Sequence, residues 1–302
     1  MSSEDRRVPL SATRHAGRFW RRFSSYDFAR GRRLVPLALA EAEPVAASMP
    51  ILFGQGEDGL EPQALLRIVP GGPSAFVSPA GLWLAAYVPS LLRVHPFSAR
   101  SAGDGRMVLL VDEGSGLVTE AIGGGDGAEP FFDADGNPAK ATSDLVDFFR
   151  EREGSALNAR RAVARLAALD LLRPFAPAKP RVPEGTWEGL LAVDRDRWAQ
   201  LDDATHLELR RLGAVGLVHA HLVSMAQVAW LQQAEALRDG AQGAGQPAPP
   251  QEGPRGIDDF LAALSEARDD HGLSGAILPS GHEDGVPAVQ DLPAGRAKGK
   301  PH

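Results

Sequence analysis

The chain has 302 residues, of which 43% are apolar, and it carries a net charge of −7. This composition is ordinary for a globular protein, and the negative charge argues against a general nucleic-acid binder. The absence of cysteine excludes disulfide bonds, thiolate zinc sites and a cysteine nucleophile.

The charge is unevenly distributed along the chain. Residues 1–33 hold nine arginines against three carboxylates, a net charge of +6, which leaves about −13 for the remainder. We expect this basic segment to dock on the acidic body of the protein, and a patch for an anionic partner is the alternative. The segment contains no apolar run of signal-peptide length, so we expect a cytoplasmic protein.

Strands are predicted in the first half of the chain, where short apolar runs are separated by turn residues. They are expected at 34–41, 50–53, 64–69, 74–78 and 107–111. The third and fourth flank the Pro-Gly-Gly-Pro sequence at 70–73, which favours a hairpin. Residues 1–33 are expected to be irregular.

Residues 81–97 combine a predicted strand, a turn and a short helix. Trp83 and Tyr87 fall on one face of the strand, because side chains alternate along it. Pro89 suits the first helical position, since its missing N–H has no helical partner there, and Pro96 ends the helix. We expect Trp83 and Tyr87 to be buried neighbours that anchor the core.

Helices are predicted in the second half, where apolar residues recur every three or four positions. They are expected over 142–173, with Gly154 as a candidate interruption, and over 203–238. The proline-rich run 174–185 predicts a linker. The apolar stretch 214–231 includes two histidines, a serine and a glutamine, so we expect a core helix there and no transmembrane segment.

The chain therefore divides into a flexible N-terminus (1–7), a domain (8–238) and a low-complexity tail (239–302). The tail has too few apolar residues to offset the entropy of ordering, so it is expected to be mostly disordered. The predicted fold class is α+β, with a mainly antiparallel β-sheet from the N-terminal half packed by helices of the C-terminal half.

Several short segments, in this order, resemble the SapC family of bacterial proteins. They are Pro9-Leu10-Ser11, Leu34-Val35-Pro36-Leu37, Pro50-Ile51-Leu52-Phe53, and Ala220-His221-Leu222-Val223-Ser224-Met225. The central block also fits the family pattern, through Trp83, Tyr87, Pro89, Arg93, Pro96 and Phe97. Ala85-Ala86 departs from it, since glycine is usual there, and so does Val94-His95, where Arg-Tyr is usual. The resemblance extends over residues 8–237.

The resemblance implies a role linked to the bacterial cell surface, because the family name comes from a gene associated with surface-layer proteins. An unrelated peptide-transporter permease carries the same name. The present chain is not similar to that permease, since it has no predicted transmembrane helix.

Two carboxylates, Glu41 and Asp112, sit at the predicted ends of strands, where a sheet could gather them into one site. Solvated strand termini are the more ordinary interpretation. His219 and His221 are separated by about 200° on a helix, so they cannot both face one ion, and we expect them to be packing residues. His95 and His221 remain candidates for catalysis, and no metal or cofactor is predicted.

We expect a non-catalytic binding or assembly protein linked to cell-surface or uptake systems, because no nucleophile elbow, Walker loop or dinucleotide fingerprint occurs. Its partner would be a protein or a cell-surface component, not a nucleic acid. The alternative is a metal-dependent enzyme, similar to an iron oxygenase, that uses His95, His219 or His221 with a carboxylate. The chain lacks the His-x-Asp pair usual for such a site, which ranks this alternative second.

Overall fold

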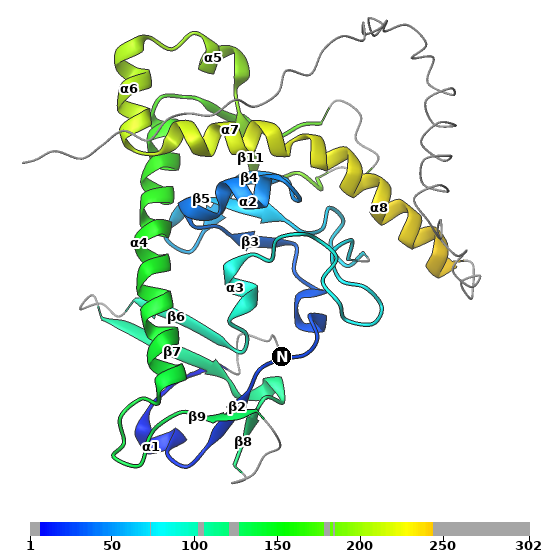
Figure 1. Ribbon diagram of the computed structural model, residues 1–302. Helices are drawn as coiled ribbons and strands as arrows, with labels where there is room; N and C mark the ends of the chain where they lie inside the picture. The colour runs from blue at the N-terminus through cyan, green and yellow to red at the C-terminus, as the bar shows by residue number, and fades with distance from the viewer. Residues whose placement is uncertain are drawn as a thin grey trace, which may run out of the picture. The chain divides into compact units, whose positions relative to one another are not determined.

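The computed structural model describes residues 7–72, 74–101, 106–120, 127–177, 182–183 and 185–243. All of them belong to one unit, Met1–Gln246. Antiparallel sheets from the first half pack against helices of the second half (Figure 1), which confirms the predicted α+β class. There are three such sheets among the described residues, where one was expected. The prediction of a disordered tail falls almost entirely on residues outside the described ranges.

The largest sheet has five strands in the order β10-β11-β4-β5-β3. Their bounds are Leu172–Pro174, Leu190–Val193, Ile51–Gly56, Gly59–Leu65 and Leu34–Pro36. Strands β4 and β5 form the hairpin, with Ile51 opposite Ala64 and Gly56 opposite Gly59. The hairpin expected around 70–73 is therefore wrong, because the turn at 57–58 already pairs this strand on one edge while β3 takes the other.

The other two sheets have three strands each, in the orders β1-β7-β6 and β8-β2-β9. The first comprises Arg7–Pro9, Met107–Asp112 and Phe97–Ser101, and the second comprises Val118–Thr119, Phe19–Arg21 and Ala128–Pro130. The described part of the basic segment, residues 7–33, thus contains strands and short helices, contrary to expectation. Its arginines pair with acidic residues of the body, since Arg14 and Arg18 contact Glu113 and Arg22 contacts Glu129.

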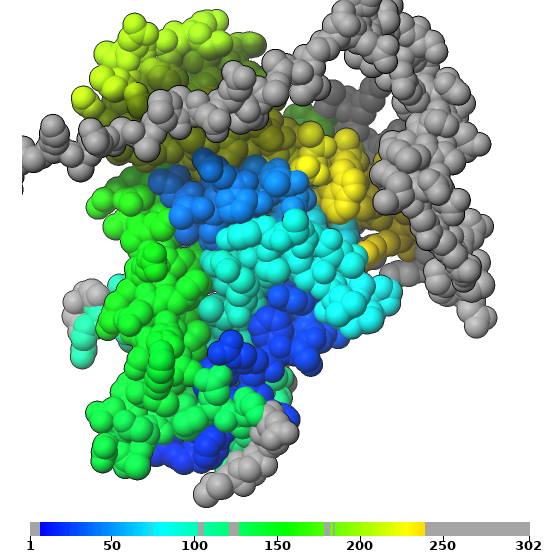
Figure 2. Space-filling view, in the orientation of Figure 1, coloured from blue at the N-terminus to red at the C-terminus, as the bar shows by residue number. Residues whose placement is uncertain are grey.

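Helix α4, Lys140–Ala168, connects two apolar cores and is not interrupted at Gly154. Near its start, Phe149 packs in a smaller core with Trp20, Phe97 and Phe131. Farther along, its buried residues join the core that covers the five-stranded sheet. In the space-filling view, α4 lies along the strands and loops of the first half over much of its length (Figure 2).

The predicted helix at 203–238 is divided into three. These three are α6 Asp203–Arg211, α7 Ala214–Ser224 and α8 Ala226–Gly243, and the short helix α5, Arg195–Ala199, precedes them. Gly213 separates α6 from α7 with a φ of 74°, and a Cβ there would lie 2.7 Å from Leu39 Cδ2. Only glycine suits that conformation and approach. No single helix among the described residues could span a membrane by length and hydropathy; α7 and α8 together meet the criterion but are bent by 41°.

Short helices complete the structure between the sheets. They are α1 Ala12–His15, η2 Asp27–Ala29, η3 Leu39–Glu41, α2 Ala42–Ala46, α3 Ser90–Arg93 and η4 Glu113–Ser115. Helix α3 lies beside both cores, because Leu92 belongs to the larger core and Leu91 packs against each of them. Helix α3 is therefore packed against both apolar cores.

Candidate functional site

The stretch 81–97 does not contain the predicted strand. Trp83 makes one isolated bridge to Val77, and the backbone then runs without regular structure to Pro89. Pro89 is the N-cap of α3 and not its first residue. A strand is prevented at the start of the stretch, because Gly81 has a φ of 79° and its O accepts a hydrogen bond from Tyr26 N at 2.8 Å.

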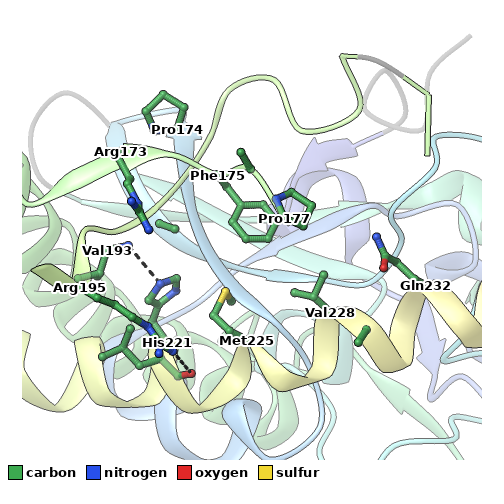
Figure 3. Close-up of a pocket in the computed structure, with 14 residues that line it drawn as sticks. Arg173, Pro174, Phe175, Pro177, Val193, Arg195, His221, Met225, Val228 and Gln232 are labelled. Atoms are coloured by element: carbon green, nitrogen blue, oxygen red, sulfur yellow. Dashed lines mark hydrogen bonds between the residues drawn. The ribbon is translucent and has the colours of Figure 1, made fainter. Parts of the chain in front are cut away.

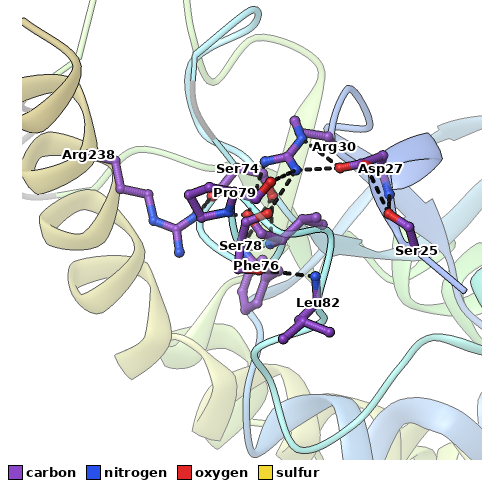
Figure 4. Close-up of polar contacts among 10 residues, drawn as sticks. Ser25, Asp27, Arg30, Ser74, Phe76, Ser78, Pro79, Leu82 and Arg238 are labelled. Atoms are coloured by element: carbon purple, nitrogen blue, oxygen red, sulfur yellow. Dashed lines mark hydrogen bonds and ion pairs between the residues drawn. The ribbon is translucent and has the colours of Figure 1, made fainter. Parts of the chain in front are cut away.

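Two arginines fix the loop that leads into this stretch (Figure 4). Arg30 donates to Ser78 O at 2.7 Å and to Val77 O at 3.4 Å, and it also pairs with Asp27. Arg238, from α8, donates to Val77 O at 3.1 Å and to Ser74 O. These bonds satisfy loop carbonyl groups that have no strand partner, so the loop has a defined position.

Trp83 and Tyr87 are neighbours, as expected, although each is only partly buried. The indole Nε1 of Trp83 donates to the backbone O of Tyr87 at 2.9 Å. The Trp83 ring also stacks on Phe76, with 5.8 Å between ring centroids. The pair is thus joined through a turn and not across a sheet face.

Glu41 lies at the centre of a buried polar cluster. Its Oε1 accepts hydrogen bonds from Ser90 N at 2.6 Å and from the Tyr87 hydroxyl at 3.1 Å. Its Oε2 accepts from Ser90 Oγ at 2.7 Å and from Ala38 N at 3.1 Å. Glu41 ends the short helix η3, not a strand. The carboxylate therefore joins η3 to α3 through its two hydrogen bonds with Ser90, while the other two come from Tyr87 and from the N-cap of η3.

Arg152 completes this cluster, and the sequence did not identify it. Its Nε donates to Ser90 Oγ at 3.0 Å and lies 3.8 Å from Glu41 Oε2, while Nη2 donates to Pro36 O at 2.8 Å. Burial lowers the pKa of this guanidinium, and the charge of Glu41 opposes that effect. One signal was present: Arg152 lies three residues after Phe149 on the buried face of α4, where a charge requires a partner.

The cluster reaches the surface through Tyr87 and Arg93. Arg93 Nη2 donates to the Tyr87 hydroxyl at 3.3 Å, and its guanidinium lies 5.5 Å from the centroid of the Tyr87 ring. Burial, followed by the charge of Glu41, raises the pKa of the Tyr87 hydroxyl above its ordinary value of 10.0. The Tyr87 hydroxyl therefore stays protonated. It accepts a hydrogen bond from exposed Arg93 and donates one to buried Glu41.

Two adjoining hollows open beside this chain of contacts and share Arg93 and Phe148. The smaller one, of about 260 Å³, is lined by Glu41, Tyr87, Ser90 and Arg152, among others. The larger one, of about 520 Å³, is mostly aromatic and apolar; its rings come from Trp20, Phe23, Tyr26, His95, Phe97 and Phe148. A volume of that size lies within the range of about 300–1,000 Å³ that is typical of small-molecule pockets.

His95 lies in the wall of the aromatic hollow. Its ring stacks on Phe28, with centroids 3.9 Å apart and planes 12° apart. Burial lowers the pKa of His95 to about 4, although the charge of Asp112 opposes the shift. Asp112 itself caps η4 by accepting from Gly114 N at 3.0 Å. His95 is thus a neutral, stacked ring at pH 7, and Asp112 is not among the contacts of Glu41.

His221 lies elsewhere, between α7 and the five-stranded sheet (Figure 3). Its Nδ1 donates to Ile51 O at 2.7 Å, and its Nε2 accepts from Val193 N at 3.2 Å. Burial lowers the pKa of His221 to about 4. Both ring nitrogens are therefore occupied by backbone groups, whereas exposed His219 packs near Trp198.

The candidate residues from the sequence are thus not gathered into one site. Glu41 lies with Tyr87 and Arg93, His95 and Asp112 lie near the aromatic hollow, and His221 lies in the main core. Across the ranges that the structure describes, no group of three or more His, Cys, Asp or Glu side chains is arranged to hold a metal ion.

The comparisons with known proteins identify the family but not an activity. No curated protein and no solved structure matches the chain. The SapC family model matches residues 10–231, which is more than half of the chain and includes every residue of the Glu41 cluster and both hollows. The chain therefore belongs to the SapC family.

Proposed function

We propose that this chain is a binding or assembly protein whose ligand site is the aromatic hollow beside Arg93. The proposal rests on the unpaired charge of Arg93. Its side chain is exposed, lines both hollows and has no carboxylate partner among the described residues. The other arginine that lines the aromatic hollow, Arg22, is already paired with Glu129. Arg93 is thus the group best placed to receive a negative charge.

The walls of the hollow indicate what the rest of the ligand looks like. Phe23, Phe97 and Phe148 offer ring faces and edges, which favour a flat ring or an apolar body. A carboxylate or phosphate attached to that body would pair with the guanidinium of Arg93. We propose that this carboxylate or phosphate belongs to a cell-surface component, as the family resemblance implies. The protein would bind that component from the cytoplasmic side.

The geometry of the polar groups favours binding over catalysis. Ser90 Oγ already donates to Glu41 and accepts from Arg152, so it is not a free nucleophile. The ring nitrogens of His221 are engaged by backbone groups. A metal-dependent enzyme remains the second candidate, and stoichiometric iron or zinc in purified protein that is lost on replacing His95 or His221 would favour it.

The proposal is tested by capturing partners with the immobilised full-length protein from an envelope fraction of the native organism. Arg93→Gln is the variant, because Arg93 is exposed and contributes only a 3.3 Å bond to the fold. Arg100→Gln is the matched control, an exposed arginine on the adjoining strand β6. We expect a component that the native and Arg100→Gln proteins retain and Arg93→Gln loses. The same retained components in all three samples would contradict the proposal.

A further inference from the structure

A third hollow, which shares no lining residue with the two beside Arg93, opens between β10 and the helices α7 and α8 (Figure 3). It has a volume of about 750 Å³. Arg173 and Arg195 lie at one end and Gln232 at the other (Figure 3). Between them the surface is apolar, with Phe175, Met225 and Val228 among its lining residues. We call this hollow the α7–α8 groove.

The charged residues that line the groove, Arg173 and Arg195, are both positive. Neither arginine has a carboxylate partner in the part of the chain that the structure describes; Arg195 makes one bond of 3.5 Å to Leu222 O. Among the described residues that line the groove, none is an aspartate or a glutamate. His221, at the arginine end, is neutral because both its nitrogens face backbone groups. The groove therefore has a cationic end and an apolar floor.

We propose that the α7–α8 groove binds a single-chain amphiphile with an anionic head. The carboxylate or phosphate head pairs with Arg173 and Arg195, which bind such groups through directed, charge-assisted hydrogen bonds. The alkyl chain lies on Phe175, Met225 and Val228 and is removed from water there. The distance from His221 to Gln232 along the helices is roughly 15 Å, which suits a dodecyl chain.

Titration calorimetry on the full-length protein tests the proposal with dodecanoate and dodecyl phosphate, each below its critical micelle concentration. Dodecyltrimethylammonium is the control for charge. We expect saturable binding of at least one of the two anions and at least tenfold weaker binding of the cation. A preference between the anions distinguishes a carboxylate head from a phosphate head.

Two variants locate the binding. The double substitution Arg173→Gln with Arg195→Gln removes the cationic end, and Ala229→Phe fills the groove from an exposed position. Each should weaken binding at least tenfold, whereas Arg161→Gln, an exposed arginine on α4, and Arg93→Gln should not. No binding of either anion, equal binding of the cation, or unchanged affinity in both groove variants would overturn the proposal. Because Arg93→Gln affects only the site beside the aromatic hollow, failure of one proposal is distinguishable from failure of the other.

Discussion

Replacement of Glu41 by glutamine is expected to destabilise the fold, although the side chain keeps its size. The carboxylate accepts four hydrogen bonds, from Ala38 N, Tyr87 Oη, Ser90 N and Ser90 Oγ. An amide has one accepting oxygen, and its NH₂ group would face donors instead. About two bonds are therefore lost, and each unpaired buried group costs about 1–3 kcal/mol. The expected loss in the free energy of unfolding is about 2–6 kcal/mol.

Urea denaturation followed by tryptophan fluorescence measures this loss. Glu43→Gln is the matched control, because Glu43 is exposed two residues farther on, and it should change the free energy by less than about 0.5 kcal/mol. If Glu41→Gln is as stable as the control, the carboxylate does not hold η3 and α3 together. The arrangement of Tyr87 and Arg93 at the proposed site would then need another explanation.

Two further stability predictions follow from the same contacts. Trp83→Ala should lower the free energy of unfolding by about 2–4 kcal/mol in urea denaturation, because a partly buried ring and its bond to Tyr87 are lost; unchanged stability would contradict this. His221 should also contribute a fall of up to about 3 kcal/mol in the free energy of unfolding between pH 6.5 and about 4, because its pKa is near 6.5 in the unfolded chain but about 4 in the fold. His221→Gln should remove this share of the pH dependence and His219→Gln should not.

Much of the fold could be predicted from local sequence. The apolar run Ile-Leu-Phe at 51–53 is a buried strand, and the periodic pattern after residue 140 is a long helix. The β4–β5 hairpin was missed, because Pro-Gly-Gly-Pro at 70–73 is a stronger turn signal than Glu57-Asp58. The break at Gly213 was missed because the positive φ of 74° that separates α6 from α7 there is not visible in the apolar periodicity of the sequence.

The candidate site was predictable only in part, for a similar reason. The family resemblance identified Tyr87 and Arg93, and Glu41 was proposed because of an expected strand end that does not exist. What places Glu41 is its set of partners: Ser90 is 49 residues away and binds both oxygens of the carboxylate, and Arg152 comes from another helix. No local sequence pattern predicts such contacts, although Arg152, a charged residue on the buried face of α4, indicated that a partner was needed.

The central claim is that the aromatic hollow beside Arg93 is a ligand site, and hydrogen–deuterium exchange of the full-length protein tests it most directly. Exchange would be compared with and without the component that the native protein captures from the envelope fraction. Slower exchange is expected in α3 with its following residues, 90–97, and in 19–26, the segments that line the aromatic hollow. Protection elsewhere with these segments unchanged, or no protection at all, would contradict the claim.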